Sequence, residues 1–154
     1  MKSICSVTPV SFILGVLALT FSVAFTPGLG TLTFRISGME SSKGVVRVAL
    51  YDNDKNFLSE FGFAAADSAF AHANGTVDVV IHNLPFGTYA AAIYQDENQN
   101  GVIDQNLVKI PTEPYAFSNG VYAKWSVPSF KEVAFQFEQP NVRLEAELRS
   151  WSKQ

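Results

Sequence analysis

The chain has 154 residues, of which 47% are apolar, and its formal net charge at pH 7 is −3. This length is typical of one domain, and the apolar fraction is large enough to build a buried core. The nearly balanced charge argues against a nucleic-acid partner, because a nucleic-acid-binding surface needs a patch of Lys and Arg side chains.

The N-terminal segment has the pattern of a signal peptide. Lys2 supplies a positive charge, and an almost unbroken apolar run follows from Val10 to Phe25. Small residues, Ser22 and Ala24, occupy the positions that signal peptidase reads, so we predict cleavage after Ala24. The alternative is an uncleaved anchor, which would be the chain's one contact with the membrane. The run is shorter than the roughly 18–20 residues that span a bilayer comfortably.

The single cysteine, Cys5, lies in the segment that would be removed. The mature chain would then contain no disulfide, which fits bacterial export better than a small disulfide-stabilised secreted domain. We therefore expect a periplasmic or extracellular protein. Its predicted parts are a signal peptide (1–24), a short linker (25–30), a β-sandwich domain (31–149) and a C-terminal tail (150–154).

Apolar and polar residues alternate with a period of two along most of the remaining chain, which indicates half-buried strands. The segments 31–36 and 45–51 are predicted to pair as a hairpin, as are 133–137 and 141–148. Two further strands are expected at 76–81 and 87–94. The segment 57–71 has no clear period and is predicted to be a crossover with a short helical turn.

These elements predict an all-β fold. About seven short strands with frequent turn residues indicate a single antiparallel β-sandwich, transthyretin-like or immunoglobulin-like, with a long loop between the middle strands. No Cys…Trp…Cys framework is present, so a disulfide-bonded immunoglobulin domain is excluded.

The long loop begins with a calcium-type pattern. Asp96, Asn98 and Asn100 alternate before Gly101, and Asp104 occupies the ninth position of the pattern. Alternate oxygens of a tight loop can point inward at a hard cation, and Ca²⁺ prefers six to eight of them.

The loop departs from an EF-hand at its twelfth position, where Leu107 replaces the bidentate Glu, and its flanks are strands. The missing carboxylate would come from Glu113, Asp52 or Asp54. Few of the donors are charged, so we expect modest calcium affinity. The alternative is a metal-free loop folded by Asx-turns. The predicted calcium ligands are Asp96, Asn98, Asn100, Asp104 and Glu113.

The segment from Leu84 to Gly120, LPFGTYAAAIYQDENQNGVIDQNLVKIPTEPYAFSNG, followed by VPSFKEVAFQF, resembles an uncharacterised bacterial family, the domain of unknown function 2141. The likeness covers roughly residues 32–148 and implies a transthyretin-like β-sandwich. It implies no activity. The chain departs from the family at Gln95, where the family usually has His, and at Lys109, Pro114 and Ala116, where glycine is common.

The family pattern carries onto a set of polar and aromatic residues of this loop. They are Asp96, Glu97, Asn98, Asn100, Gly101, Asp104, Asn106, Pro111, Glu113, Tyr115, Phe117, Ser118 and Asn119. The missing His weakens any proposal of imidazole catalysis or of a His-ligated transition metal.

The first functional hypothesis is an exported binding or accessory module for a protein or glycan partner, with the long loop as its functional edge. Aromatic rings beside amides suit such contacts, although each ring taken alone is better explained by packing. The predicted partner surface comprises Tyr94, Glu97, Asn106, Tyr115, Phe117, Ser118 and Asn119, with Tyr122 and Trp125 nearby.

Two alternatives remain. A purely structural envelope protein fits the sequence equally well. A hydrolase that uses paired carboxylates from Asp96, Glu97, Asp104 or Glu113 has little support, because both histidines, His72 and His82, lie outside the loop. The chain also lacks the histidines and the basic–Ser C-terminus of transthyretin-related purine hydrolases, so that activity is rejected.

Overall fold

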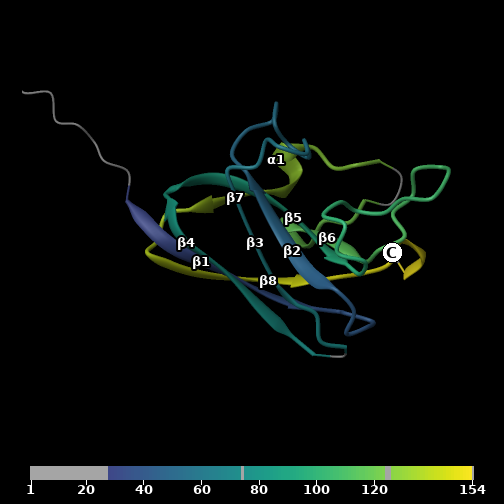
Figure 1. The fold of residues 1–154 in the computed structure, drawn as a ribbon. Helices are drawn as coiled ribbons and strands as arrows, with labels where there is room; N and C mark the ends of the chain where they lie inside the picture. The colour runs from purple at the N-terminus through teal and green to yellow at the C-terminus, as the bar shows by residue number, and fades with distance from the viewer. Residues whose placement is uncertain (1–27, 74, 124–125, 154) are drawn as a thin grey trace, which may run out of the picture.

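The protein is a β-sandwich of two sheets (Figure 1). The computed structural model describes residues 28–73, 75–123 and 126–153. The predicted signal peptide, the first half of the linker and Trp125 therefore lie outside the described residues. The first sheet has three strands in the order β4-β1-β8, and the second has five, in the order β3-β2-β5-β6, with β7 paired to β5. The predicted fold class is confirmed.

The elements are short and are nearly all strands. No helix among these residues is long and apolar enough to cross a membrane. The elements are β1 (Leu29–Ser37), β2 (Val45–Tyr51), β3 (Ala65–Phe70), β4 (Val77–Pro85), β5 (Gly87–Asp96), β6 (Tyr115–Phe117), a 3₁₀ turn η1 (Ser118–Gly120), α1 (Phe130–Val133), β7 (Ala134–Phe137), β8 (Asn141–Glu147) and a second 3₁₀ turn η2 (Trp151–Lys153).

The core lies between the two sheets and contains the apolar residues that alternate along each strand. Phe34 and Ile36 of β1 and Val46 and Leu50 of β2 are fully buried. Phe137 of β7 is also fully buried, and its ring contacts that of Phe86 edge-on. The period of two therefore identifies the buried faces, because side chains of a strand point alternately to opposite sides.

Both predicted hairpins are wrong. The strands β1 and β2 belong to different sheets, and so do β7 and β8. Two half-apolar strands can bury their inner faces across a sandwich as well as side by side, and the sequence pattern is the same in both cases. Gly44 closes the β1–β2 connection with φ +69°, and a Cβ there would lie 1.8 Å from the backbone oxygen of Asp96.

One strand pair is parallel, although the prediction was an antiparallel sandwich. The first and last strands, β1 and β8, pair in parallel from Thr31↔Asn141 to Ser37↔Glu147. Parallel neighbours need a long connection, and here almost the whole domain lies between the two strands.

Two strands were missed. The strand β3 occupies part of the segment that was predicted to be a crossover, and β6 lies inside the predicted long loop. The edge strand β3 pairs with β2 alone and exposes most of its residues, so its sequence carries no clear alternation. Its partner, and not its own pattern, holds it in the sheet.

The outward faces of the two sheets differ in chemistry. The three-stranded sheet presents ion pairs, in which Asp78 lies 3.1 Å from Arg35 and 3.6 Å from Arg143. Such a face is well solvated. The five-stranded sheet places the small side chains of Ala49 and Ala92 at the centre of its outward face, which leaves that face hollow.

Candidate functional site

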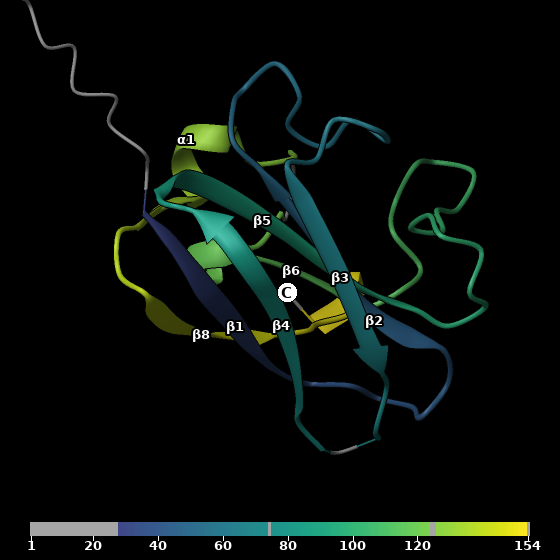
Figure 2. The same cartoon turned by 60° about the vertical axis from the view of Figure 1, so that its left-hand side comes forward.

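A groove lies over the outward face of the five-stranded sheet, with a volume of ≈ 1230 Å³. Small side chains of Ala49, Ala66 and Ala92 line it. One wall is the segment 58–63, between β2 and β3, and the other is the segment 100–111, between β5 and β6. Figure 2 shows these two connecting segments as separate loops, the first at the upper end of β2 and β3 and the second to their right.

Tyrosine hydroxyls brace both walls against the sheet. Tyr94 donates to the backbone oxygen of Gly101 at 2.8 Å, and Tyr115 donates to that of Ala123 at 2.9 Å. On the opposite wall, Tyr51 donates to Ser59 at 3.5 Å. Burial raises the pKa of Tyr51 and of Tyr94, so both hydroxyls remain protonated donors at neutral pH.

The carboxylate of Asp96 organises the start of the 97–114 segment. It is fully buried at the end of β5 and accepts hydrogen bonds from Arg47 Nε at 2.6 Å, from the N–H of Gly101 at 2.9 Å and from the N–H of Asn100 at 3.0 Å. Burial alone would raise the pKa of Asp96. The Arg47 and backbone hydrogen bonds, together with the Arg47 charge, outweigh it and lower that pKa.

A second carboxylate, that of Glu113, closes the same segment. Its side chain is 5% exposed and accepts one hydrogen bond from the N–H of Glu97 and one from the N–H of Asp104, each at 2.9 Å. Burial raises the pKa of Glu113 despite these two bonds, and the charges of Asp104 and Asp96 add to the increase. Glu113 therefore connects the start of the calcium-type loop, at Glu97, to its end, at Asp104.

The amides of the calcium-type pattern form Asx-turns. Asn98 Oδ1 accepts from the N–H of Asn100 at 3.0 Å, and Asn100 Oδ1 accepts from the N–H of Val102 at 2.9 Å. Their amide nitrogens donate to Asp104, at 2.7 Å from Asn98 and 3.0 Å from Asn100. The loop thus closes on itself through hydrogen bonds from its own side chains.

These bonds bear on whether a cation fits. Of the two carboxylates in the pattern, Asp96 is paired with Arg47 and with backbone N–H groups of the loop. In the described part of the chain, the carboxylate of Asp104 accepts hydrogen bonds only from the side-chain amides of Asn98 and Asn100. The amide oxygens of Asn98 and Asn100 accept backbone N–H groups and their nitrogens face Asp104, so uptake of Ca²⁺ would require both amides to turn their oxygens toward the cation. Among the residues that the structure describes, no group of three or more His, Cys, Asp or Glu side chains is arranged to hold a metal ion.

The structure separates the two alternative donors from the loop. Asp52 and Asp54 follow the far end of β2, whereas Asp96 pairs with Val45 at its near end. Seven residues of strand place them roughly 20 Å apart, so the expectation that Asp52 or Asp54 completes the site is wrong. Glu113 is the candidate donor that does reach the loop.

The residues of the predicted partner surface fall into two groups. Tyr94 is half-buried and lines the groove, where Tyr115 and Phe117 form part of its base and are 4% and 8% exposed. Ser118 is buried, accepting from the N–H of Ala91 and donating to Val133. Tyr94, Tyr115 and Phe117 therefore shape the groove more than they offer contact area, and Ser118 is not part of its lining.

The remaining predicted residues are exposed or half-buried and hold turns. Glu97 accepts from the hydroxyl of Ser41 at 2.6 Å, and Asn119 donates to Ala134 at 2.9 Å. Asn106 accepts from the N–H groups of Val108 and Ile110, each at 3.0 Å.

Two residues of the site were not foreseen. Arg47 lies on the outward face of β2, opposite Tyr94, and reaches diagonally to Asp96. Gln95, fully buried, donates to Ser41 and Lys43 across the sandwich end, while its Oε1 has no partner among the described residues. An arginine on an otherwise apolar strand face was the available signal, but locating its partner requires the strand register.

Comparison with known families finds a match. A model described as "Uncharacterized protein conserved in bacteria (DUF2141)" matches residues 34–145. The comparison finds no matching curated protein and no matching solved structure. The matched range contains the complete 97–114 segment and both walls of the groove.

Proposed function

The chain belongs to the bacterial family DUF2141, and we propose that it is an exported protein-binding module whose recognition surface is the groove on the five-stranded sheet. The observation that carries this proposal is the concentration of exposed apolar side chains around one hollow. The export part rests on the signal-peptide pattern alone, and the exported form is expected to begin at Phe25.

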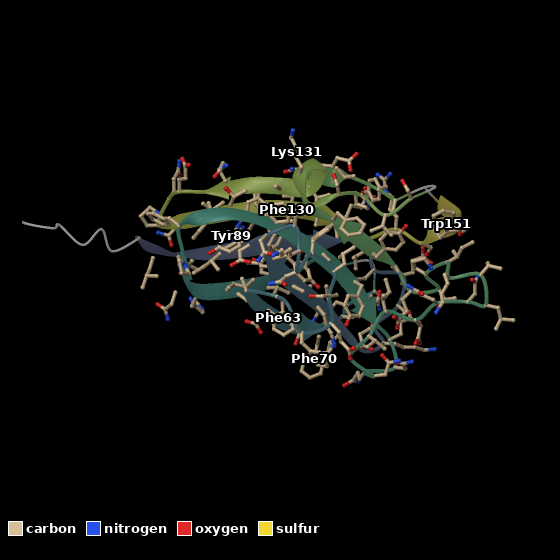
Figure 3. All side chains as sticks on the ribbon, turned by 90° about the horizontal axis from the view of Figure 1, so that it is seen from above. Phe63, Phe70, Tyr89, Phe130, Lys131 and Trp151 are labelled. Atoms are coloured by element: carbon tan, nitrogen blue, oxygen red, sulfur yellow. The ribbon has the colours of Figure 1, made fainter. Side chains whose placement is uncertain are left out.

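Most of the large apolar side chains that the described residues expose line this groove. Phe61 is 86% exposed, Val108 72% and Val127 64%. An exposed apolar cluster of this kind costs solubility and typically marks an interaction site. Figure 3 shows Phe63 and Phe70 on the side of the molecule opposite Lys131 and Phe130.

The groove favours a protein over a glycan partner. A glycan needs free hydrogen-bond donors and acceptors beside an exposed ring. Here the hydroxyls of Tyr51 and Tyr94 are already bonded to backbone oxygens of the walls, and that of Tyr115 is bonded to the backbone oxygen of Ala123. The exposed rings are phenylalanines, which offer apolar area and no polar group. A protein segment with apolar side chains would complement this surface.

Photo-crosslinking in the cells that produce the protein tests this proposal. A photoreactive amino acid is placed at Phe61 or Val108 on the groove walls, and at His82 on the opposite sheet as the control. We expect a discrete protein adduct from the two groove positions and none from His82. A lack of adducts at the groove, or the same adduct from all three positions, would contradict it.

We also propose that the 96–104 loop takes up Ca²⁺ weakly. The spacing of the oxygen donors Asp96, Asn98, Asn100 and Asp104 supports this. The amides of Asn98 and Asn100 now donate to Asp104, so binding would have to displace these two hydrogen bonds. Arg47 already neutralises Asp96, so the expected dissociation constant is that of extracellular modules, about 10⁻⁴–10⁻³ M.

Thermal unfolding in calcium and in chelator measures this uptake. A ligand that binds the folded form raises the midpoint as the site fills. We expect a rise at millimolar calcium that the Asp104→Ala variant lacks, while the control variant Asp67→Ala, on β3, keeps it. An unchanged midpoint would leave the loop as a self-folding turn.

A further inference from the structure

The tip of the 100–111 wall, residues 106–110, is a turn held by its own hydrogen bonds, and we call it the knob. Asn106 accepts from the N–H groups of Val108 and Ile110, and its backbone oxygen accepts from the N–H of Lys109 at 3.0 Å. The backbone of Lys109 has φ +65°, a left-handed conformation that residues other than glycine rarely adopt. The tip displays Leu107 and Val108, which are 103% and 72% exposed, beside the Lys109 ammonium.

The opposite wall has the complementary chemistry. The segment 58–63 exposes Phe61 and Phe63 and carries Glu60, and Asp67 of the neighbouring β3 lines the same side of the groove. Neither Glu60 nor Lys109 forms a salt bridge with any described residue. The wall 58–63 is therefore apolar and acidic, and the tip 106–110 of the other wall is apolar and basic.

The two walls stand at diagonally opposite corners of the sheet. Segment 58–63 follows the end of β2, at Tyr51, on the β3 side. Segment 100–111 follows the end of β5, which pairs with the start of β2 at Val45, and lies on the β6 side. A two-fold axis lying in the interface, at the midpoint between the walls, exchanges them. Each knob then meets the acidic wall of the other copy.

We propose that the partner in the groove is a second copy of this chain. The knob 106–110 of each copy packs against Phe61 and Phe63 of the other, with Lys109 facing Glu60 across the interface. This inference rests on the proposed function and names its partner. The sheet face alone is roughly 15 by 20 Å, well below the ~800 Å² per partner of a standard interface, so the contact depends on both walls and should be micromolar.

Sedimentation of the purified protein at concentrations from about 1 to 500 μM measures its self-association. Variants that exchange the charges of Lys109 and Glu60 test whether this pair lies in the interface. Each pair occurs twice in a symmetric dimer, so Lys109→Glu and Glu60→Lys should each weaken the dimer at least about tenfold. The double variant should return to within about threefold of wild type, because it restores opposite charges. The control is Lys131→Glu on α1, away from the groove, which should leave association unchanged.

Several outcomes would overturn the inference: a wild-type chain that stays monomeric throughout this range, single variants that associate as tightly as wild type, or a double variant that is no better than either single. Crosslinking distinguishes the two proposals. If the adducts formed at the groove have a mass other than twice that of the chain, the second-copy inference is overturned while the proposed binding module is supported. The absence of any groove adduct would overturn both.

Discussion

Replacing Asp96 with Asn is expected to lower the free energy of unfolding by about 3 kcal/mol at pH 7. The side chain is fully buried, so bulk solvent cannot replace a lost acceptor. An amide of the same shape keeps one acceptor oxygen but turns an NH₂ group toward Arg47 and Gly101, or toward Asn100, each of which donates to the wild-type carboxylate. Urea unfolding of both proteins measures the difference.

The pH dependence of this difference has a definite sign. The pKa of Asp96 is lowered in the folded protein, so its stabilisation is present above the unfolded pKa of about 3.9 and is lost as the pH falls through the folded value. The difference between wild type and Asp96→Asn should therefore be steady near neutral pH and shrink below about pH 4. The matched control is Asp67→Asn on the exposed β3, which should change stability by less than about 0.5 kcal/mol.

Replacing Glu113 with Gln is expected to lower the free energy of unfolding by about 2 kcal/mol at pH 7. Both carboxylate oxygens accept a backbone N–H, and an amide can accept only one of them. The loss is smaller than for Asp96 because burial already penalises the ionised Glu113, and the variant removes that penalty.

Titration separates the two carboxylates. The pKa of Glu113 is raised, so its contribution is fully present below the unfolded pKa of about 4.3 and is lost as the pH rises through the folded value. The difference between wild type and Glu113→Gln should widen as the pH falls from 7 toward 4. The Asp96→Asn difference should do the opposite below pH 4. If the stability differences of the two variants changed with pH in the same way, neither carboxylate would have the environment described. The control is Glu60→Gln on the exposed wall.

Alternation of apolar residues was enough to predict the sandwich and most of its strands, because buried faces leave a period of two in the sequence. It did not determine which strands pair. Leu32, Phe34 and Ile36 are as well buried against the opposite sheet as they would be within a hairpin, so the sheet membership of β1 was missed. The edge strand β3 left no pattern at all, since its outward residues face the groove.

The candidate site was only partly predictable for a related reason. The loop chemistry is local, so Asp96, Asn98, Asn100 and Asp104 could be identified from their spacing, and Glu113 from its position shortly after them. Arg47 could not, because it lies on another strand and meets Asp96 through the register of β2 and β5. The groove itself comes from segments that are far apart in the chain.

The central claim is that Asp96 and Glu113 hold the 97–114 segment in one shape, so that the groove exists before any partner or cation binds. Amide hydrogen exchange of the wild-type protein in chelator tests this claim directly. The N–H groups of Glu97, Asn100, Gly101 and Asp104 are predicted to exchange at least about a hundredfold more slowly than those of Gln99 and Leu107, which have no acceptor among the described residues. Equal exchange across all six positions would contradict it, and the groove would then lack a fixed wall.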